Sequence, residues 1–194
     1  MYAPDVTVPE RLIDAATRLF ADKGFDRVAV QEIVQSAGVT KGAMYHYFGS
    51  KDDLLHEIYG RVLRMQTERL EKVSADSAPI ADRLHAAATD VIVTSVENFD
   101  AAKVFFRSID SLAEETRREV RAERRRYHEK FRSLIEEGQS AGVFRADVPA
   151  DLTTHYFFGS VHHLGTWYRT DGPVSARQLA DYYADLLLAS VTKA

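Results

Sequence analysis

The stretch that decides the fold is VQEIVQSAGVTKGAMYHYFGSKDDLL, residues 30–55. Its first part places apolar residues on one helical face and ends at Gly38, which breaks the helix. Thr40 begins a second short helix as its N-cap, and Met44 supplies an inward-facing anchor within it. Ser50 then caps a third helix. Two short helices joined by a glycine-containing turn predict a helix-turn-helix, the motif that lays a helix in the major groove of DNA.

The residues before this stretch predict another helix. In PERLIDAATRLFADKGFDRV, residues 9–28, apolar side chains repeat at the spacing of one helical face, and Gly24 closes the helix. This helix and the stretch that follows it resemble the DNA-binding domain of TetR-family transcriptional regulators. The resemblance is carried by the strings AxxLFxxxGF (Ala16 to Phe25), AGVTKGAMYHYF and SKDDLL. The resemblance covers roughly the first third of the chain. It departs at Ala29, where such proteins often carry a serine or threonine that caps the second helix.

The resemblance implies an all-α protein that binds a palindromic operator in double-stranded DNA as a homodimer. It places the helix Thr40–Phe48 of each subunit in the major groove, with half-sites about 34–36 Å or a multiple apart. We expect groove and base contacts from Lys41, Tyr45 and His46. Phosphate contacts are expected from Thr40, Gly42, Tyr47 and Lys51, with Arg27 or Gln31 taking over what Ala29 lacks. Repression is the default in this family.

Composition agrees with this interpretation. The 194 residues are 45% hydrophobic and 28% charged, and they include no cysteine, which excludes disulfides and thiolate metal sites. The N-terminus lacks the pattern of a signal peptide and no apolar run reaches the length of a membrane span, so we expect a cytoplasmic protein without a membrane partner. The net charge is −4. DNA affinity must therefore come from local placement of basic side chains, which favours a dimer over a weakly binding monomer.

The rest of the chain has helical periodicity throughout. We expect nine helices in two domains: residues 1–52, the helix-turn-helix domain, and residues 53–194, a ligand-binding and dimerisation domain. Within the second domain a long helix is predicted over 114–137, a loop over 137–151, and two last helices over about 151–169 and 175–192.

In the family, the last two helices of each subunit pair as a four-helix bundle. Apolar residues and two interior glycines, Gly159 and Gly165, suit these helices to that role, although ordinary core within one chain is the alternative. The predicted interface consists of Phe157, Val161, Leu164, Leu179, Tyr182, Tyr183, Leu186 and Leu187.

The 114–137 helix carries a basic stripe beside an apolar face. Five arginines and His128 fall within a sector of about 100° on a helical wheel. An amphipathic anion would need such a stripe, and a solvated face partly paired with Asp100, Asp110 or Glu114 is the alternative interpretation. The stripe consists of Arg117, Arg121, Arg124, Arg125, Arg132 and His128.

The segment THYFFGSVHHLGTWYRTDGPVS, residues 154–175, more weakly resembles TetR-family members that respond to acyl-CoA thioesters. An acyl-CoA is therefore one candidate effector. Besides the stripe, the predicted lining comprises Phe105, Phe106, Tyr127, Phe131, Phe158, His162 and Trp167.

Other functions are open but less favoured. They are a drug- or lipophile-responsive repressor of an efflux system, an all-helical enzyme that binds acyl thioesters, and a nonspecific architectural DNA binder. His155, His162, His163 and Asp151 lack the spacing of common metal motifs, and no phosphate-binding loop or nucleophile elbow is present, so neither a metal nor a cofactor is expected.

Overall fold

Capping residues set the ends of the first helices. The computed structural model describes residues 6–192, and every side chain among them except that of Phe106. Helix α1 (Val8–Lys23) begins at Thr7, which forms a reciprocal capping box with Glu10. Helix α2 (Val30–Ala37) ends at Gly38, whose φ of +63° is the left-handed conformation that favours glycine. Helix α3 (Lys41–Tyr47) follows after a short turn.

The chain forms two compact units. The first contains the residues up to Val62 together with Asp100–Arg121. It holds α1 to α3, the start of α4 (Lys51–Ser74), most of α6 (Phe99–Ser108), the 3₁₀ turn η1 (Ile109–Ser111) and the start of α7 (Glu114–Ser140). Leu12, Ile33, Met44, Leu54, Phe105 and Val120 are among the buried residues of its core.

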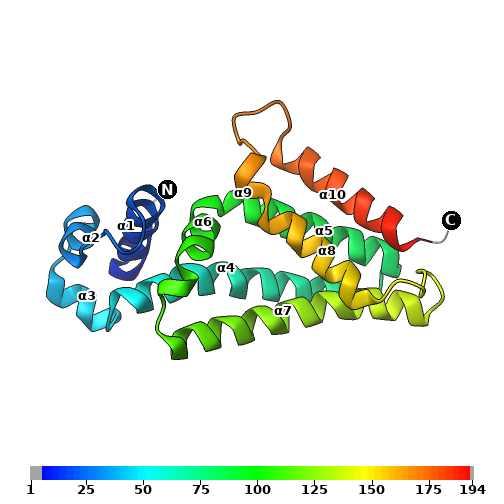
Figure 1. The fold of residues 1–194 in the computed structure, drawn as a ribbon, viewed down its shortest axis with the longest axis horizontal. Helices are drawn as coiled ribbons and strands as arrows, with labels where there is room; N and C mark the ends of the chain where they lie inside the picture. Colours follow the sequence, from blue (N-terminus) through cyan, green and yellow to red (C-terminus); the bar gives the residue numbers. More distant parts are fainter. Residues whose placement is uncertain (1–5, 193–194) are drawn as a thin grey trace. The chain divides into compact units, whose positions relative to one another are not determined.

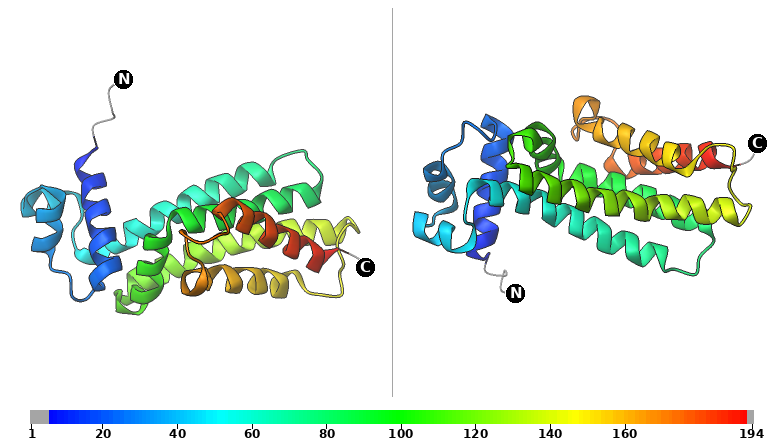
Figure 2. Two further views of the ribbon diagram at one scale, coloured as in Figure 1. Left: turned by 90° about the horizontal axis from the view of Figure 1, so that it is seen from above. Right: turned by 60° about the horizontal axis from the view of Figure 1, so that its bottom comes forward.

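The second unit is built around α5 (Ile80–Glu97). It contains Leu63–Phe99 and the residues from Ala122 onward. Helix α5 packs beside α8 (Ala150–His162) and α10 (Ala176–Val191), as Figures 1 and 2 show. Buried residues follow one another around α5 with little interruption, which is the pattern of a central helix rather than a surface one.

Two contacts fix the end of α7 in this unit. The buried Arg83 guanidinium donates hydrogen bonds to the Ser74 and Ala78 carbonyl oxygens, at 2.9 and 3.1 Å, and to the Glu137 carboxylate. Gly138 lies against the Phe144 ring so closely that an added Cβ would lie 2.0 Å from it. The Arg83 contacts connect the α4–α5 loop to the last turns of α7, and the Phe144 contact holds the segment after α7 against that helix.

The all-α fold predicted from the sequence is confirmed, and among the described residues there is no strand. Two boundaries differ. The α7 helix continues to Ser140, so Gly138 is helical rather than part of the predicted loop. A glycine stands at this helical position because the Phe144 ring occupies the space where a Cβ would lie. The helix predicted over 151–169 is broken at His163 into α8 and the short α9 (Leu164–Trp167).

The predicted division between residues 52 and 53 does not coincide with the two units. Leu54, Leu55 and Ile58 of α4, and Val104 and Phe105 of α6, lie in the same core as α1 to α3. They belong to the first unit because they bury the apolar faces of its helices. Among the described residues, no helix combines the length and the hydropathy needed to cross a membrane.

Candidate nucleic-acid interface and ligand site

The α3 helix is held by one buried residue and one cap. Met44 is fully buried and anchors the helix on the core of the first unit. The Thr40 hydroxyl accepts a hydrogen bond from the Ala43 amide at 3.1 Å, which confirms its predicted capping role. With only seven residues, α3 depends on this anchoring, because an isolated helix of that length is not stable in water.

The other face of α3 is open. Lys41, Gly42 and His46 are exposed, and the side chains of Tyr45 and Tyr47 are 47% and 49% exposed. Lys41 Nζ lies 5.8 Å from the centre of the Tyr45 ring, and the rings of His46 and Tyr47 meet edge to face at 4.9 Å. The helix thus presents a continuous surface of cationic, aromatic and imidazole groups without apolar anchors, which suits the floor and walls of a DNA groove.

Lys51 makes contacts within the first unit that the sequence did not predict. Its ammonium donates hydrogen bonds to the Phe25 and Val28 carbonyl oxygens, at 2.8 and 3.1 Å, and lies 4.3 Å from the centre of the Phe25 ring. Two of its three donors are therefore used to hold the α1–α2 loop. The phosphate contact of Lys51 stays a prediction, and in the structure the side chain holds the loop that leads into α2.

In the described part of the chain, the hydroxyl that Ala29 lacks is not replaced by another side-chain acceptor, and only the Glu32 half of a capping box is present at the start of α2. The Glu32 carboxylate accepts a hydrogen bond from the Ala29 amide at 3.2 Å and also pairs with Lys23. The pKa of Glu32 is lowered, first by the hydrogen bond from Lys23 and then by that from the Ala29 amide. Arg27 and Gln31 are exposed beside this cap and remain predicted DNA contacts.

Between α7 and α8 lies a cluster of rings and one arginine, which we name the His–Arg cluster: Arg124, His128, Phe158 and His162. The His128 ring stacks on Phe158 at 3.9 Å, and Arg124 donates from Nη2 to His162 Nε2 at 3.2 Å. Burial, followed by the charge of Arg124, lowers the pKa of His128 to about 4 and that of His162 to about 3. Both imidazoles are therefore neutral at pH 7, and His162 accepts rather than donates at Nε2.

The residues of the predicted basic stripe are divided between the two units. Arg117 and Arg121 belong to the first unit and Arg124, Arg125, His128 and Arg132 to the second. Arg117 is paired with Glu114, and Arg132 with Glu136 and Asp151. Pairing with acids therefore describes Arg117 and Arg132 at the ends of the stripe, and Arg121, Arg124, Arg125 and His128 remain predicted contacts for an anion.

Most of the predicted aromatic lining is core. Phe131 and Tyr127 are buried, and Phe131 stacks on Phe157 at 5.1 Å. Phe105 lies in the first unit, where it stacks on Tyr59 at 3.5 Å. Trp167 is 55% exposed, so it does not line an interior pocket. The Phe106 side chain lies outside the described part of the structure.

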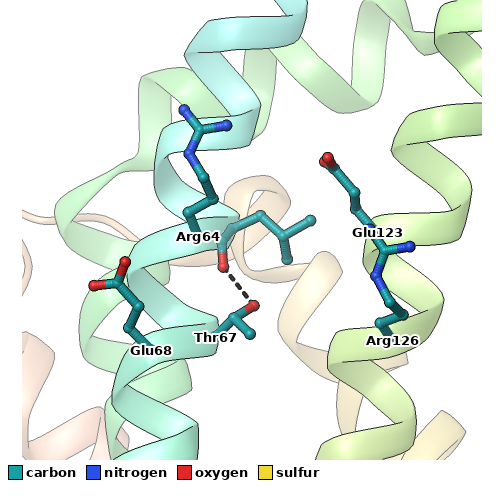
Figure 3. A pocket seen from close by; sticks show the side chains of 6 residues that line it. Arg64, Thr67, Glu68, Glu123 and Arg126 are labelled. Carbon is teal, nitrogen blue, oxygen red and sulfur yellow. Dashed lines mark hydrogen bonds between the residues drawn. The ribbon is translucent and has the colours of Figure 1, made fainter.

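A cavity of about 210 Å³ lies elsewhere, between α4 and α7 (Figure 3). Its lining comprises Leu63, Arg64, Thr67, Glu68, Glu123 and Arg126. None of these residues was predicted from the sequence, because charged residues at helical spacing are typical of any solvated face. Within residues 6–192, no group of three or more histidine, aspartate or glutamate side chains is arranged to hold a metal ion.

The residues of the predicted dimer interface fall into a buried group and an exposed group. Five of its residues are buried within one chain, as expected for the alternative of ordinary core, namely Phe157, Val161, Leu164, Leu179 and Leu187. Tyr183 is half-buried, whereas Tyr182 and Leu186 are 59% and 67% exposed. Leu152 and Tyr156 of α8, four residues apart, are similarly exposed and were not among the residues predicted for the interface.

The comparisons with known proteins decide the family. Residues 12–58 match the family model for bacterial regulatory proteins of the tetR family, and residues 77–191 match the tetracyclin repressor-like C-terminal domain. The chain belongs to the TetR family of transcriptional regulators. Both halves of the chain, and not only the helix-turn-helix, carry the resemblance.

Similar TetR-family proteins cover the chain almost from end to end. The HTH-type transcriptional repressor KstR2 of Mycobacterium tuberculosis is 26% identical over 184 residues, which is 94% of this chain and 92% of that protein. The crystal structure of the regulator PfmR from Thermus thermophilus has a TM-score of 0.84 at 31% identity and covers 92% and 97% of the two chains. The structure of AibR in complex with isovaleryl coenzyme A and operator DNA has a TM-score of 0.81 at 23% identity, covering 94% and 98%.

Proposed function

We propose that this TetR-family regulator is a repressor that binds a palindromic operator as a homodimer and is released by a small-molecule effector. The observation that carries the proposal is the α3 helix, which buries Met44 and exposes Lys41, Tyr45 and His46 on one open face. Each of these three side chains can reach a base edge or a groove wall. KstR2, which is similar over most of the chain, is named a transcriptional repressor.

An acyl-CoA is the effector class that we propose. The His–Arg cluster combines a guanidinium, two neutral imidazoles and an aromatic ring, which together offer donors for a phosphate or a thioester oxygen beside an apolar surface. The AibR structure, which has the same fold, contains isovaleryl coenzyme A.

The proposed release mechanism uses the continuity of α4. Its residues Lys51–Val62 belong to the first unit and Leu63–Ser74 to the second, so one helix is shared by the DNA-binding unit and the unit that contains the His–Arg cluster. An effector that favours a different separation of the two α3 helices in the dimer would cost contacts in one half-site.

The test is fluorescence anisotropy on the DNA upstream of the protein's own gene, at fixed physiological salt. Separate Tyr45→Ala and His46→Ala variants should bind about 5- to 150-fold more weakly, since a base contact contributes about 1–3 kcal/mol. Lys103→Ala, an exposed change in α6, is the control and should bind normally. Unchanged affinity and base preference in both α3 variants would refute the role of α3.

The effector is tested on the same complex. Acyl-CoA esters should reverse binding, whereas the free acids and neutral lipophiles should not, and Arg124→Gln should abolish the reversal while sparing DNA affinity. Arg118→Gln on the same helix is the matched control. Release by lipophiles but not by any ester would exclude the acyl-CoA proposal and leave the repressor.

A further inference from the structure

The cavity between α4 and α7 has a lining that the proposed effector site does not use. It has a volume of about 210 Å³, which is room for about seven water molecules at 30 Å³ each. Its α7 side is formed by Glu123 and Arg126. On a helical wheel these two positions lie away from Arg124 and His128, so the cavity and the His–Arg cluster are on different faces of α7.

The apolar part of the cavity is its floor. Leu63 is buried, and the half-buried Thr67 presents its methyl group beside it. The Thr67 hydroxyl donates to the Leu63 carbonyl at 2.7 Å, as the dashed line in Figure 3 marks. Its proton is therefore committed, and toward a ligand the hydroxyl acts as an acceptor.

The rim carries both signs of charge on each side. Arg64 and Glu68 come from α4, four residues apart, and Glu123 and Arg126 come from α7, three residues apart (Figure 3). Such neighbours on one helix have Cβ atoms about 5–6 Å apart. Each wall of the cavity thus offers one positive and one negative group at a separation that a small molecule can span.

Two of these charges are available to a ligand. Within residues 6–192, neither Glu68 nor Arg126 takes part in an ion pair, and both are exposed. Further along the same two helices, Glu71 and Lys130 do pair across the gap at 3.9 Å. The α4–α7 seam is therefore bridged by an ion pair beyond the cavity, next to the exposed charges of Glu68 and Arg126.

We propose that this cavity binds a small zwitterion, with a carboxylate and an ammonium group separated by a few methylenes. A simple anion beside Arg126 would also feel Glu123 on the same helix, and a simple cation beside Glu68 would feel Arg64, so each gains little. A zwitterion places its carboxylate against a guanidinium and its ammonium against a carboxylate, and both contacts are attractive. Its methylenes cover Leu63 and the Thr67 methyl group.

A ligand in the cavity would connect α4 and α7 at the point where each helix enters the second unit. Leu63 and Arg64 are the first residues of that unit on α4, and Glu123 is its second residue on α7. A ligand held by both helices restrains their relative motion at this level. The site is separate from DNA binding and from the proposed effector, so it stands even if the acyl-CoA proposal fails.

The experiment is methyl NMR of the full chain with labelled threonine, using the Thr67 methyl as reporter and Thr67→Ser to assign it. The probes are glycine, β-alanine, 4-aminobutanoate and 6-aminohexanoate, with butanoate and butylammonium as singly charged controls. We expect one zwitterion to shift the Thr67 signal saturably, with a Kd at least tenfold below that of either control, while the Thr17 methyl in α1 stays unmoved.

Site variants complete the test. Arg126→Gln and Glu68→Gln should each weaken the best zwitterion about tenfold or more, whereas Arg118→Gln, an exposed change on α7 outside the cavity, should not. The proposal is overturned if no zwitterion saturates the Thr67 signal below about 50 mM, because weaker binding would not distinguish a site from bulk solvent. Equal affinity for butanoate or butylammonium, or an unchanged Kd in Arg126→Gln, would overturn it as well.

Discussion

At the scale of single residues, two lysines that look alike in the sequence have different roles. Lys41 is exposed at the start of α3, whereas Lys51 is bonded to the Phe25 and Val28 carbonyl oxygens. Sequence reasoning assigned both to DNA. It could not separate them, because the partners of Lys51 lie more than 20 residues away in the chain.

Replacing each lysine by alanine should have opposite effects on stability and on DNA binding. Lys51→Ala should lower the free energy of unfolding by about 1.5–3 kcal/mol, the range for hydrogen bonds from a charged group, as measured by urea denaturation. Lys41→Ala should leave stability unchanged and weaken operator binding about 5- to 150-fold in fluorescence anisotropy, since a base contact contributes about 1–3 kcal/mol. If Lys51→Ala is as stable as the wild type and has a smaller slope of log K against log salt, Lys51 contacts a phosphate instead.

The buried imidazoles make stability depend on pH. The pKa values of His128 and His162 are lowered to about 4 and 3 in the folded chain, below the ordinary value of 6.5. Between pH 6.5 and about 4 the unfolded chain therefore binds protons that the folded chain does not, and stability falls as the pH falls. Each such proton lowers the free energy of unfolding by about 1.4 kcal/mol per pH unit.

Urea denaturation at pH 7.5 and pH 5 measures this loss. The double variant His128→Gln, His162→Gln should be less stable at pH 7.5 but should lose less stability between the two pH values. An equal loss in the wild type and the double variant would show that other groups cause the pH dependence.

At the scale of helices, periodicity predicted the elements well and their ends less well. The amphipathic faces of α1 and α2 and the caps at Thr40 and Ser50 are local features, and the structure confirms them. The length of α7 and the break at His163 depend on tertiary packing. Gly138 is the clearest case: a glycine predicts a loop, but here it makes room for the Phe144 ring inside a helix.

The sequence could identify the two helices of the candidate dimer interface, but not which of their residues are exposed. Periodicity identifies which residues are apolar, but both the core face and the partner face of α8 and α10 are apolar, so sequence reasoning assigned several core residues to the dimer. The exposed set is Leu152, Tyr156, Tyr182 and Leu186. Gly159, on the same α8 face as Tyr156, has open space where a Cβ would lie, which suits close approach of a second helix.

Leu186→Glu tests this surface. It should shift sedimentation velocity profiles from dimer to monomer at micromolar concentration, because it would place an unpaired charge at the centre of an apolar interface. The folded monomer should remain, since the Leu186 side chain is 67% exposed. Val143→Glu, an exposed apolar residue outside α8 and α10, is the matched control, and equal dissociation by both variants would refute the proposed interface.

At the scale of the whole molecule, the two units are joined by continuous helices. Helices α4 and α7 each pass from the first unit into the second, and α6 and the start of α7 share the core of α1 to α3. The sequence predicted one DNA-binding and one C-terminal domain, divided after residue 52. It could not reveal that residues 100–121 return to the first core, because that contact joins segments distant in the chain.

The measurement that tests the proposed repressor most directly is selection of bound sequences from a random pool of double-stranded DNA, with wild-type protein and Tyr45→Ala in parallel. We expect the wild type to enrich a palindrome whose half-sites are centred about one helical turn, or a multiple of it, apart, and Tyr45→Ala to lose preference at defined positions of each half-site. Enrichment of no sequence by the wild type, or of the same motif with the same strength by both proteins, would contradict the proposed reading of DNA by α3.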